Sequence, residues 1–445
     1  MTTVTAPQVA QSGLDRAERN NPPFVAMRSK GRGIVERWWI AMLVLPMMIA
    51  SDWKYRRRVA TSALTGSVDS QILIEVAVYG FVLLYVVLKH GRAPRLRRTS
   101  NLMFSLWFSS AFLAGSSLYA IYAKVSIVRG VQVLIICCVI QTIATNARIE
   151  HLHRFAHAYL VLVVVAIAIG AVHQFHIANT VDGRFHWLYV HPVPGAMWFM
   201  VAALISAAYV RSAELRGVLN LWPTWVYSGL GSLAAIALIL TKTRGSIAGF
   251  AVALAAMLLL HTTAKTKLDI AAFGILILTT IIAAFGSLIL LYLGRGEDPS
   301  KLATLNERTN LWAIAFQRVA ERPITGYGLG ASRGLFLDSL KLGGGHNAFV
   351  NVLVDVGVIG FAAFVAVLTF IVCKLWRYRR GTFGHRDALI LLPVFVALLV
   401  NSITAEFLAV PANHASLWLM MLCGWIAVLD RADRSYAAAN TYVRA

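Results

Sequence analysis

Apolar residues in this chain come in blocks of about twenty, separated by short polar and basic segments. The runs Val161–Ala171 and Ala251–Leu260 lack the alternation of apolar and polar positions that a membrane β-barrel strand needs. A block of about twenty apolar residues crosses the ~30 Å hydrocarbon core of a bilayer as an α-helix. The pattern therefore predicts an all-α, polytopic membrane protein.

The apolar blocks predict about twelve spans. Their boundaries fall near 35–52, 71–89, 100–120, 125–145, 154–174, 194–211, 224–241, 246–263, 269–293, 346–374, 387–408 and 413–430. The predicted organisation is a basic N-terminal tail (1–34), spans one to nine (35–293), a long loop (294–345), spans ten to twelve (346–430) and a second tail (431–445). No small-residue cleavage site follows the first apolar run, so no cleavable signal peptide is expected.

Composition agrees with a membrane class, because 58% of the residues are hydrophobic and 14% are charged, against about a quarter charged in soluble domains. An even number of spans puts both termini on the same side of the membrane. Placing them in the cytoplasm puts most Lys and Arg residues there as well, as the positive-inside rule requires. The net charge of +21 then reflects topology and anionic membrane lipids, and it does not point to nucleic acid.

A few basic residues lie on the predicted outer side, against this rule. Arg244 and Lys242 occupy the short turn between the seventh and eighth spans, and Arg184 lies in the outer loop 175–193. The cluster Arg56–Arg58 follows the first span. An anionic lipid-linked ligand would give these charges a role, and contact with lipid headgroups is the alternative.

Three acidic residues lie in or at the ends of predicted spans: Glu75, Asp355 and Glu406. Acids inside a membrane are costly and are functional candidates by default. Pairing with a nearby arginine is the other interpretation, and we keep it open for Asp355.

The loop between the ninth and tenth spans, 294–345, predicts a helix in its middle. Asn306 can cap its start, and Pro323 ends it. Helical periodicity places five apolar residues on one face, namely Leu311, Trp312, Ala315, Phe316 and Val319. Arg308 and Arg322 fall on the same face, so each needs an anionic ligand or a carboxylate partner. The helix separates them by roughly 21 Å, too far for both to hold one diphosphate.

Two glycine-rich segments follow that helix. Gly326-Tyr327-Gly328-Leu329-Gly330 is not preceded by a strand, so it predicts a turn with close backbone approach and not a dinucleotide loop. Gly343-Gly344-Gly345-His346-Asn347 has the backbone freedom to turn and delivers His346 to the start of the tenth span. A histidine at a membrane interface is either structural or catalytic, and spacing alone leaves both readings open.

These motifs resemble the O-antigen ligase and polymerase superfamily of bacterial membrane glycosyltransferases. Its diagnostic region runs from an Arg-x-x-x-Trp helix, through a Pro-x-x-Gly-x-Gly turn, to a His-Asn pair that opens a span ending in Gly-x-x-Gly. A Ser/Thr-Arg-Gly turn and a weaker Arg-x(n)-His-Pro element precede it. The matching residues are Arg184, His191, Pro192, Thr243, Arg244, Gly245, Arg308, Trp312, Pro323, Gly326, Gly328, His346, Asn347, Gly357 and Gly360.

The resemblance implies transfer of a glycan from a polyprenyl diphosphate to a glycan or glycolipid acceptor at the outer face of the plasma membrane, without a metal or another cofactor. Negative charge develops on the departing diphosphate, which suits fixed arginines. The attacking hydroxyl gains from a neutral histidine that accepts its proton. We therefore expect His346 as the general base and Arg244 and Arg308 as diphosphate ligands. Further candidates for substrate binding are Arg322, Arg184, His191 and Asn347.

Three alternatives remain at this stage. A repeat-unit polymerase of the same superfamily would use the same donor, and the motifs do not separate it from a ligase. A lipid-linked oligosaccharide transporter fits the span count, but the two related halves that transporters usually show are not visible here. A non-catalytic scaffold would not need His346. The sequence does not indicate the oligomeric state.

Overall fold

The computed structural model describes residues 33–53, 70–90, 100–176, 184–186, 192–260, 286, 292, 294, 308–340, 345–380, 384–408 and 412–444. Residues 1–32 of the expected N-terminal tail therefore lie outside the described residues, as do the Arg56–Arg58 cluster and almost all of the predicted ninth span. The contacts discussed below all belong to the unit from Trp39 onward.

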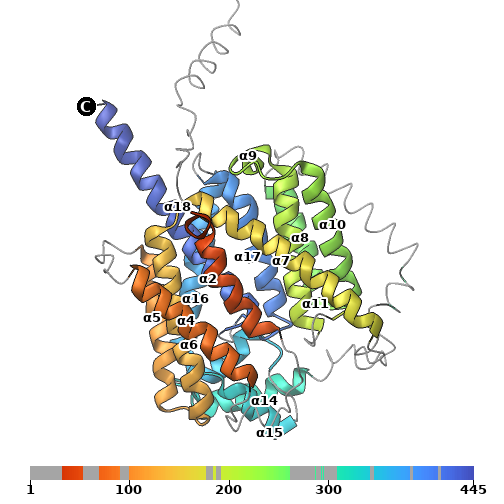
Figure 1. The fold of residues 1–445 in the computed structure, drawn as a ribbon. Coiled ribbons are helices and arrows are strands. Elements are labelled where there is room, and N and C mark those ends of the chain that lie inside the picture. Colours follow the sequence, from red (N-terminus) through yellow and green to blue (C-terminus); the bar gives the residue numbers. More distant parts are fainter. Residues whose placement is uncertain are drawn as a thin grey trace, which may run out of the picture. The chain divides into compact units, whose positions relative to one another are not determined.

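Regular structure in these ranges is helical, and they contain no strand (Figure 1). The helices are α2 (Ile34–Asp52), α4 (Ser70–His90), α5 (Asn101–Gly115), the 3₁₀ turn η1 (Ser116–Leu118), α6 (Ala123–Asn146), α7 (Ile149–His176), α8 (Pro192–Arg211), α9 (Ala213–Gly217), α10 (Thr224–Leu240), α11 (Arg244–Leu260), α14 (Arg308–Glu321), α15 (Ala331–Leu340), α16 (Ala348–Arg380), α17 (His385–Ser402) and α18 (His414–Arg444). The all-α prediction is confirmed.

Each predicted span other than the ninth coincides with a helix. Eight of the described helices are long and apolar enough to cross a membrane: α2, α4, α6, α7, α8, α16, α17 and α18. The apolar helices α10 and α11 have 17 residues each, and α5 has 15. A total of twelve spans thus stays a prediction. The segment expected as a C-terminal tail continues α18 as far as Arg444.

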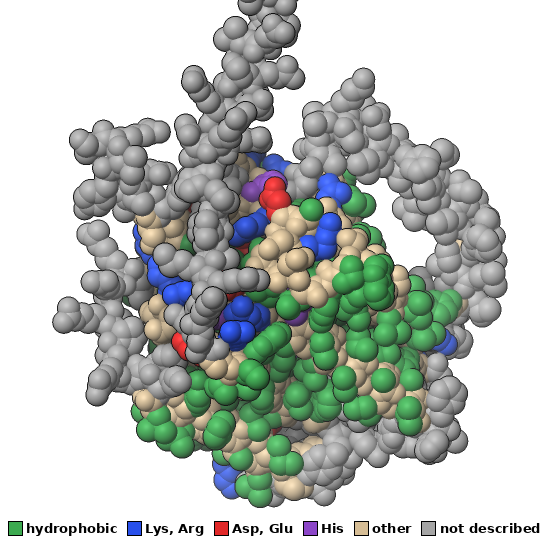
Figure 2. Space-filling model, turned by 45° about the horizontal axis from the view of Figure 1, so that its top comes forward, with side chains coloured by type: hydrophobic (Ala, Val, Ile, Leu, Met, Phe, Trp, Pro, Cys, Tyr) green, Lys and Arg blue, Asp and Glu red, His purple; other side chains and the backbone are tan. Residues whose placement is uncertain are grey.

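Large apolar side chains cover much of the surface of the helices. Phe81, Leu88 and Trp225 are each more than half exposed, and Figure 2 shows such side chains as a broad green area. Soluble monomers rarely expose apolar patches of this size, whereas a lipid-facing surface requires them. The protein is therefore a membrane protein, as its composition predicted.

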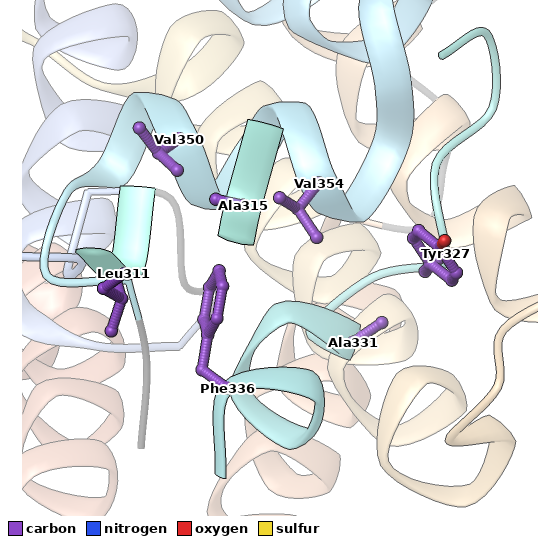
Figure 3. Close-up of a cluster of buried hydrophobic side chains, with 7 residues drawn as sticks. All are labelled: Leu311, Ala315, Tyr327, Ala331, Phe336, Val350 and Val354. Atoms are coloured by element: carbon purple, nitrogen blue, oxygen red, sulfur yellow. The ribbon is translucent and has the colours of Figure 1, made fainter. Parts of the chain in front are cut away.

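The loop after the ninth predicted span contains two helices, α14 and α15, which pack on the first turns of α16. A shared apolar cluster joins the three helices (Figure 3), and its buried members are Leu311, Ala315, Tyr327, Ala331, Phe336, Val350 and Val354. The predicted helix ends at Glu321, before Pro323, as expected. The cluster fixes α14 and α15 against a span, so the loop is a packed part of the protein.

The predicted apolar face of α14 is wrong at one position. Leu311 and Ala315 are fully buried, and Trp312 and Val319 pack against the cluster. Phe316 is 55% exposed. The buried face is narrower than the helical wheel suggested, because one side of α14 alone meets α15 and α16.

Candidate active site

The glycine turn, residues 323–330, is joined to a break in α16. Gly357 has φ 61° and ψ −167° inside that helix, so nearby backbone groups lose their helical partners. The amides of Tyr327 and Gly328 donate to the carbonyls of Val354 (3.1 Å) and Asp355 (2.7 Å), and the Val358 amide donates to Pro323 (2.8 Å). The Pro-x-x-Gly-x-Gly motif and the segment of α16 around the Gly-x-x-Gly motif are therefore hydrogen-bonded to each other.

Glycine is required at the centre of this turn for two reasons. Gly326 and Gly328 have φ of 66° and 97°, a region that side chains with a Cβ disfavour. A Cβ on Gly326 would also lie 2.6 Å from the backbone of Val354 and Asp355, and one on Gly328 would collide with Ala120. The prediction of close backbone approach is confirmed.

The segment between α5 and α6 holds the other side of the glycine turn. The Ile121 amide donates to the Tyr327 carbonyl at 3.2 Å. The Leu329 amide donates to Ser116 Oγ at 3.0 Å, and Ser126 Oγ donates to the Leu329 carbonyl at 2.6 Å. The turn is thus held on this side by residues of η1 and α6 that precede it by about two hundred positions in the sequence.

Tyr122 extends this contact to α15. Its hydroxyl donates to Asp338 Oδ2 at 2.7 Å. Burial of the phenol, followed by its bond to Asp338, raises the pKa of Tyr122 to about 12. The hydroxyl therefore stays protonated and remains a donor at neutral pH.

Asp355 anchors the start of α15. Its carboxylate accepts the amides of Gly330 (2.9 Å) and Ser332 (2.6 Å), and the residue is 6% exposed. A carboxylate at a helix N-terminus satisfies unpaired amides and complements the helix dipole. Both carboxylate oxygens of Asp355 therefore accept from backbone amides at the start of α15.

His346 has a left-handed backbone conformation, with φ 47°, and is half-buried. The residue before it is held on both backbone groups: the Gly345 amide donates to Asn351 Oδ1 at 3.1 Å, and its carbonyl accepts from Trp312 Nε1 at 3.1 Å. A non-glycine residue in this conformation is uncommon and is enriched at functional sites. The structure thus presents His346 from a strained, closely held position.

Asn347 is the N-cap of α16. Its side-chain oxygen accepts the amides of Phe349 (2.9 Å) and Val350 (3.2 Å), which is the usual role of asparagine at a helix start. The sequence proposed Asn347 as a substrate-binding candidate, and the structure uses its oxygen within the protein.

Arg184 lies beside the turn that precedes α11. It is 4% exposed, and its guanidinium donates to the Thr241 carbonyl (2.8 Å) and to Thr243 Oγ1 (3.0 Å). Arg244, which follows Thr243 in the chain, is half-buried and is the first residue of α11. The sequence elements of Arg184 and Arg244 therefore meet in space.

The same turn packs on the C-terminal end of α17. A Cβ on Gly245 would collide with Thr404, and Ser246 Oγ donates to Asn401 Oδ1 at 3.1 Å. Glu406 follows in the chain and accepts from Asn351 Nδ2 at 3.2 Å. A continuous set of contacts thus leads from Arg244 along residues 401–406 to the start of α16, where His346 lies.

A cavity of about 40 Å³ lies beside these groups, enough for a few water molecules. Its lining is Val125, Arg129, Gly330, Ser332, Arg333, Asn351, Asp355 and Glu406. Arg129 is paired with Glu75 at 2.6 Å, and Gln132 donates to the same carboxylate at 2.8 Å. The intramembrane charge of Glu75 is therefore neutralised inside the protein.

The structure does not bring every candidate to this place. Arg322 was predicted on the buried face of α14, and this is wrong, because the helix ends one residue earlier and leaves Arg322 exposed. Its guanidinium lies 4.8 Å from the centre of the Tyr327 ring. Arg308 begins α14, but its side chain is outside the described residues, as is all of His191.

The Tyr327 hydroxyl donates to the carboxylate of Glu321 at 2.5 Å. This hydrogen bond, together with one from Arg318, lowers the pKa of Glu321. The end of α14 and the glycine turn are therefore linked by an ionised carboxylate at neutral pH.

Some residues of the site were not found from the sequence. Asn351 belongs to no recognised motif. Ser116 and Ser126 lie within the predicted third and fourth spans, where nothing in the sequence indicated a site. Within the described ranges, no three His, Cys, Asp or Glu residues are grouped as a metal site would group them.

Comparison with known proteins agrees with the motifs. Residues 229–365 match the protein family described as O-antigen ligase. This region contains Arg244, the glycine turn, His346 and the break at Gly357. The match supports assignment to the O-antigen ligase-like superfamily. A search of curated proteins finds no match.

Proposed function

We propose, on the premise that this membrane protein carries an O-antigen ligase domain, that it is a glycosyltransferase of the cell envelope. It takes a glycan from a polyprenyl diphosphate, the undecaprenyl type in bacteria, and joins it to a sugar hydroxyl of a glycan or glycolipid. The reaction takes place at the outer face of the bacterial plasma membrane, with both termini in the cytoplasm. Its partners are that donor, that acceptor and the surrounding lipids.

The observation that carries this proposal is the position of His346. A left-handed histidine, held by Gly345 on one side and by the α16 cap on the other, lies among the family's motif segments. Its imidazole would accept the proton of the attacking hydroxyl as the new glycosidic bond forms. Attack from the face opposite the diphosphate would invert the anomeric carbon.

The diphosphate would be bound by Arg244 and Arg308. Each is the first residue of a helix, α11 and α14 respectively. The amides of a helix start and its positive dipole end favour phosphate, and a guanidinium adds bidentate hydrogen bonds. Arg184 would not contact the diphosphate itself; it would hold the turn from which Arg244 projects.

The test is transfer by purified protein in lipid vesicles, supplied with a defined polyprenyl-diphosphate-linked glycan and a sugar acceptor. Wild-type protein should release polyprenyl diphosphate and lengthen the acceptor, and His346→Ala should abolish both. A matched variant, His385→Ala, changes an exposed histidine at the start of α17 and should keep the wild-type rate. Full activity in His346→Ala would refute the assignment of the base.

The same assay tests two further parts of the proposal. Added EDTA should leave the rate unchanged, because the proposed mechanism places arginines and a histidine where other transferases use a divalent ion. Loss of activity that Mg²⁺ or Mn²⁺ restores would contradict this. Product length separates a ligase, which adds one donor glycan to the acceptor, from a polymerase, which builds ladders on a lipid-linked acceptor.

A further inference from the structure

The side chain of Asn351 bridges the backbone beside His346 and the carboxylate of Glu406. Its Oδ1 accepts the Gly345 amide at 3.1 Å, and its Nδ2 donates to Glu406 Oε2 at 3.2 Å. Asn351 is 3% exposed and Glu406 9% exposed, so little water competes for these bonds.

Gly345 and Glu406 together fix which way the amide of Asn351 points, because the Gly345 N–H can only donate. An amide has one accepting end and one donating end, and the Glu406 oxygen that it meets, Oε2, accepts. Glu406 therefore takes the NH₂ end of Asn351 and leaves the oxygen facing Gly345. The orientation of one side chain in α16 thus depends on the backbone beside His346 and on a residue beyond the end of α17.

This orientation bears directly on His346. With its amide bound by Asn351 and its carbonyl by Trp312, Gly345 has little freedom to rotate. Asn347, on the other side, is fixed as the cap of α16. A left-handed histidine persists only where its surroundings over-determine it, and these contacts do so.

We propose that Glu406 and Asn351 act together as a positioning pair for His346. The pair holds the backbone of His346 in the conformation from which its imidazole reaches the acceptor hydroxyl. This inference rests on the proposed function, in which His346 is the general base. Neither member of the pair is proposed to touch the substrate.

The absence of a side chain at Gly345 is required by its contact with Asn351. Its backbone φ is not in the left-handed region, so conformational freedom does not explain the glycine. A Cβ there would collide with Asn351 Oδ1 and approach Phe336 to 3.1 Å. Glycine at 345 therefore leaves room for the Asn351 oxygen, and Gly345→Ala should displace it without removing either member of the pair.

The alternative is that the two residues only hold α16 against α17. A purely structural bond would change the folded fraction or the melting temperature, and it would leave the turnover of each folded molecule intact. A displaced base lowers kcat while donor binding stays intact, because a misplacement of about 1 Å can cost on the order of 100-fold in rate. The split between kcat and KM therefore separates the two roles.

The experiment measures kcat, KM for the polyprenyl-diphosphate donor and the melting temperature in the vesicle assay. Asn351→Ala should lower kcat about 10- to 100-fold and leave the donor KM within about threefold. Glu406→Ala should do the same, and the double variant should lose no more than either single change, because residues that act as a unit are non-additive. The kcat of Gly345→Ala should lie between the kcat of these variants and that of wild type.

Two conservative variants keep the test sharp if the alanine variants fail to fold. Glu406→Gln still offers an oxygen to Asn351 and should retain kcat within about threefold of wild type. Asn351→Asp keeps the shape and the acceptor for Gly345, but it cannot donate to Glu406 and should lose kcat about tenfold.

The matched control is Gln141→Ala. Gln141 is an amide of α6 whose oxygen accepts from Trp107 at 3.2 Å, and it lies fifteen or more residues along the helix from Tyr122 and the glycine-turn contacts. Its loss should leave kcat and KM at wild-type values.

Several results would overturn the positioning pair. An unchanged kcat in Asn351→Ala or Asn351→Asp would do so, as would strictly additive losses in the double variant. If Glu406→Gln were as inactive as Glu406→Ala, the charge of Glu406 would itself be needed, and the pair would not be a positioning device. A different result, transfer of glycan by His346→Ala at the wild-type rate, would refute the proposed function itself.

Discussion

At the scale of single residues, the two motif turns share an unusual feature. Lys242 and His346 both have positive φ without being glycine, and each precedes the first turn of a helix. Such strain is tolerated where the surroundings fix it, and here Arg184 braces one turn and Asn351 the other. The protein therefore holds its two proposed reactive groups, Arg244 and His346, on rigid supports.

Arg244→Lys tests whether the guanidinium binds phosphate. A lysine keeps the charge but loses the planar, two-donor geometry, so kcat/KM for the donor should fall about tenfold, the effect of one charged hydrogen bond. Transfer kinetics in vesicles measure it. Arg148→Lys, in the exposed turn between α6 and α7, is the control and should behave as wild type. Wild-type kinetics for Arg244→Lys would contradict phosphate binding by the guanidinium and would indicate that Arg244 only contacts lipid headgroups.

The sequence named these chemical groups but not what holds them. Arg and His in these motifs were expected at the site from the family resemblance and from their chemistry. Arg184, predicted as a possible substrate ligand, is buried against a turn about sixty residues away, and its role toward the substrate stays a prediction. Asn351 was missed because a buried asparagine five residues after a histidine has no sequence signature, and its role depends on Glu406, which lies beyond the end of α17.

At the scale of elements, the central feature is the glycine turn packed into the break of α16. The sequence predicted a close-approach turn at 326–330 from its glycines and a helix that ends before Pro323, and both are confirmed. It did not predict that Gly357 interrupts a span of 33 residues. An apolar run gives no local sign of a break whose partners come from another segment.

Substitutions in the glycine turn should separate backbone strain from collision. Gly330→Ala changes a residue with φ 76° and open space around it, so it should cost about 1–2 kcal/mol of stability. Gly326→Ala has a similar φ of 66° and would also collide with α16, and it should destabilise more. Melting temperatures of the purified variants measure both.

The control for this pair is Gly229→Ala in α10, where a Cβ meets nothing within 4 Å. It should leave the melting temperature unchanged or raise it slightly, because alanine favours a helix over glycine. Equal losses for Gly326→Ala and Gly330→Ala would mean that the turn is not packed against α16 as described.

At the scale of the whole molecule, hydrophobic blocks predicted the class and the helix positions, because the bilayer dictates both. They did not predict how the helices come together. The contacts of the site join residues 116–126 to 325–329, residue 184 to 241–243, and residue 351 to 406. Pairings across such separations depend on tertiary packing, which periodicity along the chain does not record.

The central claim is that this protein consumes a lipid-linked glycan. The most direct measurement is to delete its gene, extract the membrane lipids and identify the polyprenyl-diphosphate-linked glycans by mass spectrometry. We predict that one such glycan accumulates, that the wild-type gene clears it, and that a His346→Ala gene expressed at the same level does not. The absence of any accumulated lipid-linked glycan would contradict this function. Clearance by the His346→Ala protein at the wild-type level would contradict the role of His346.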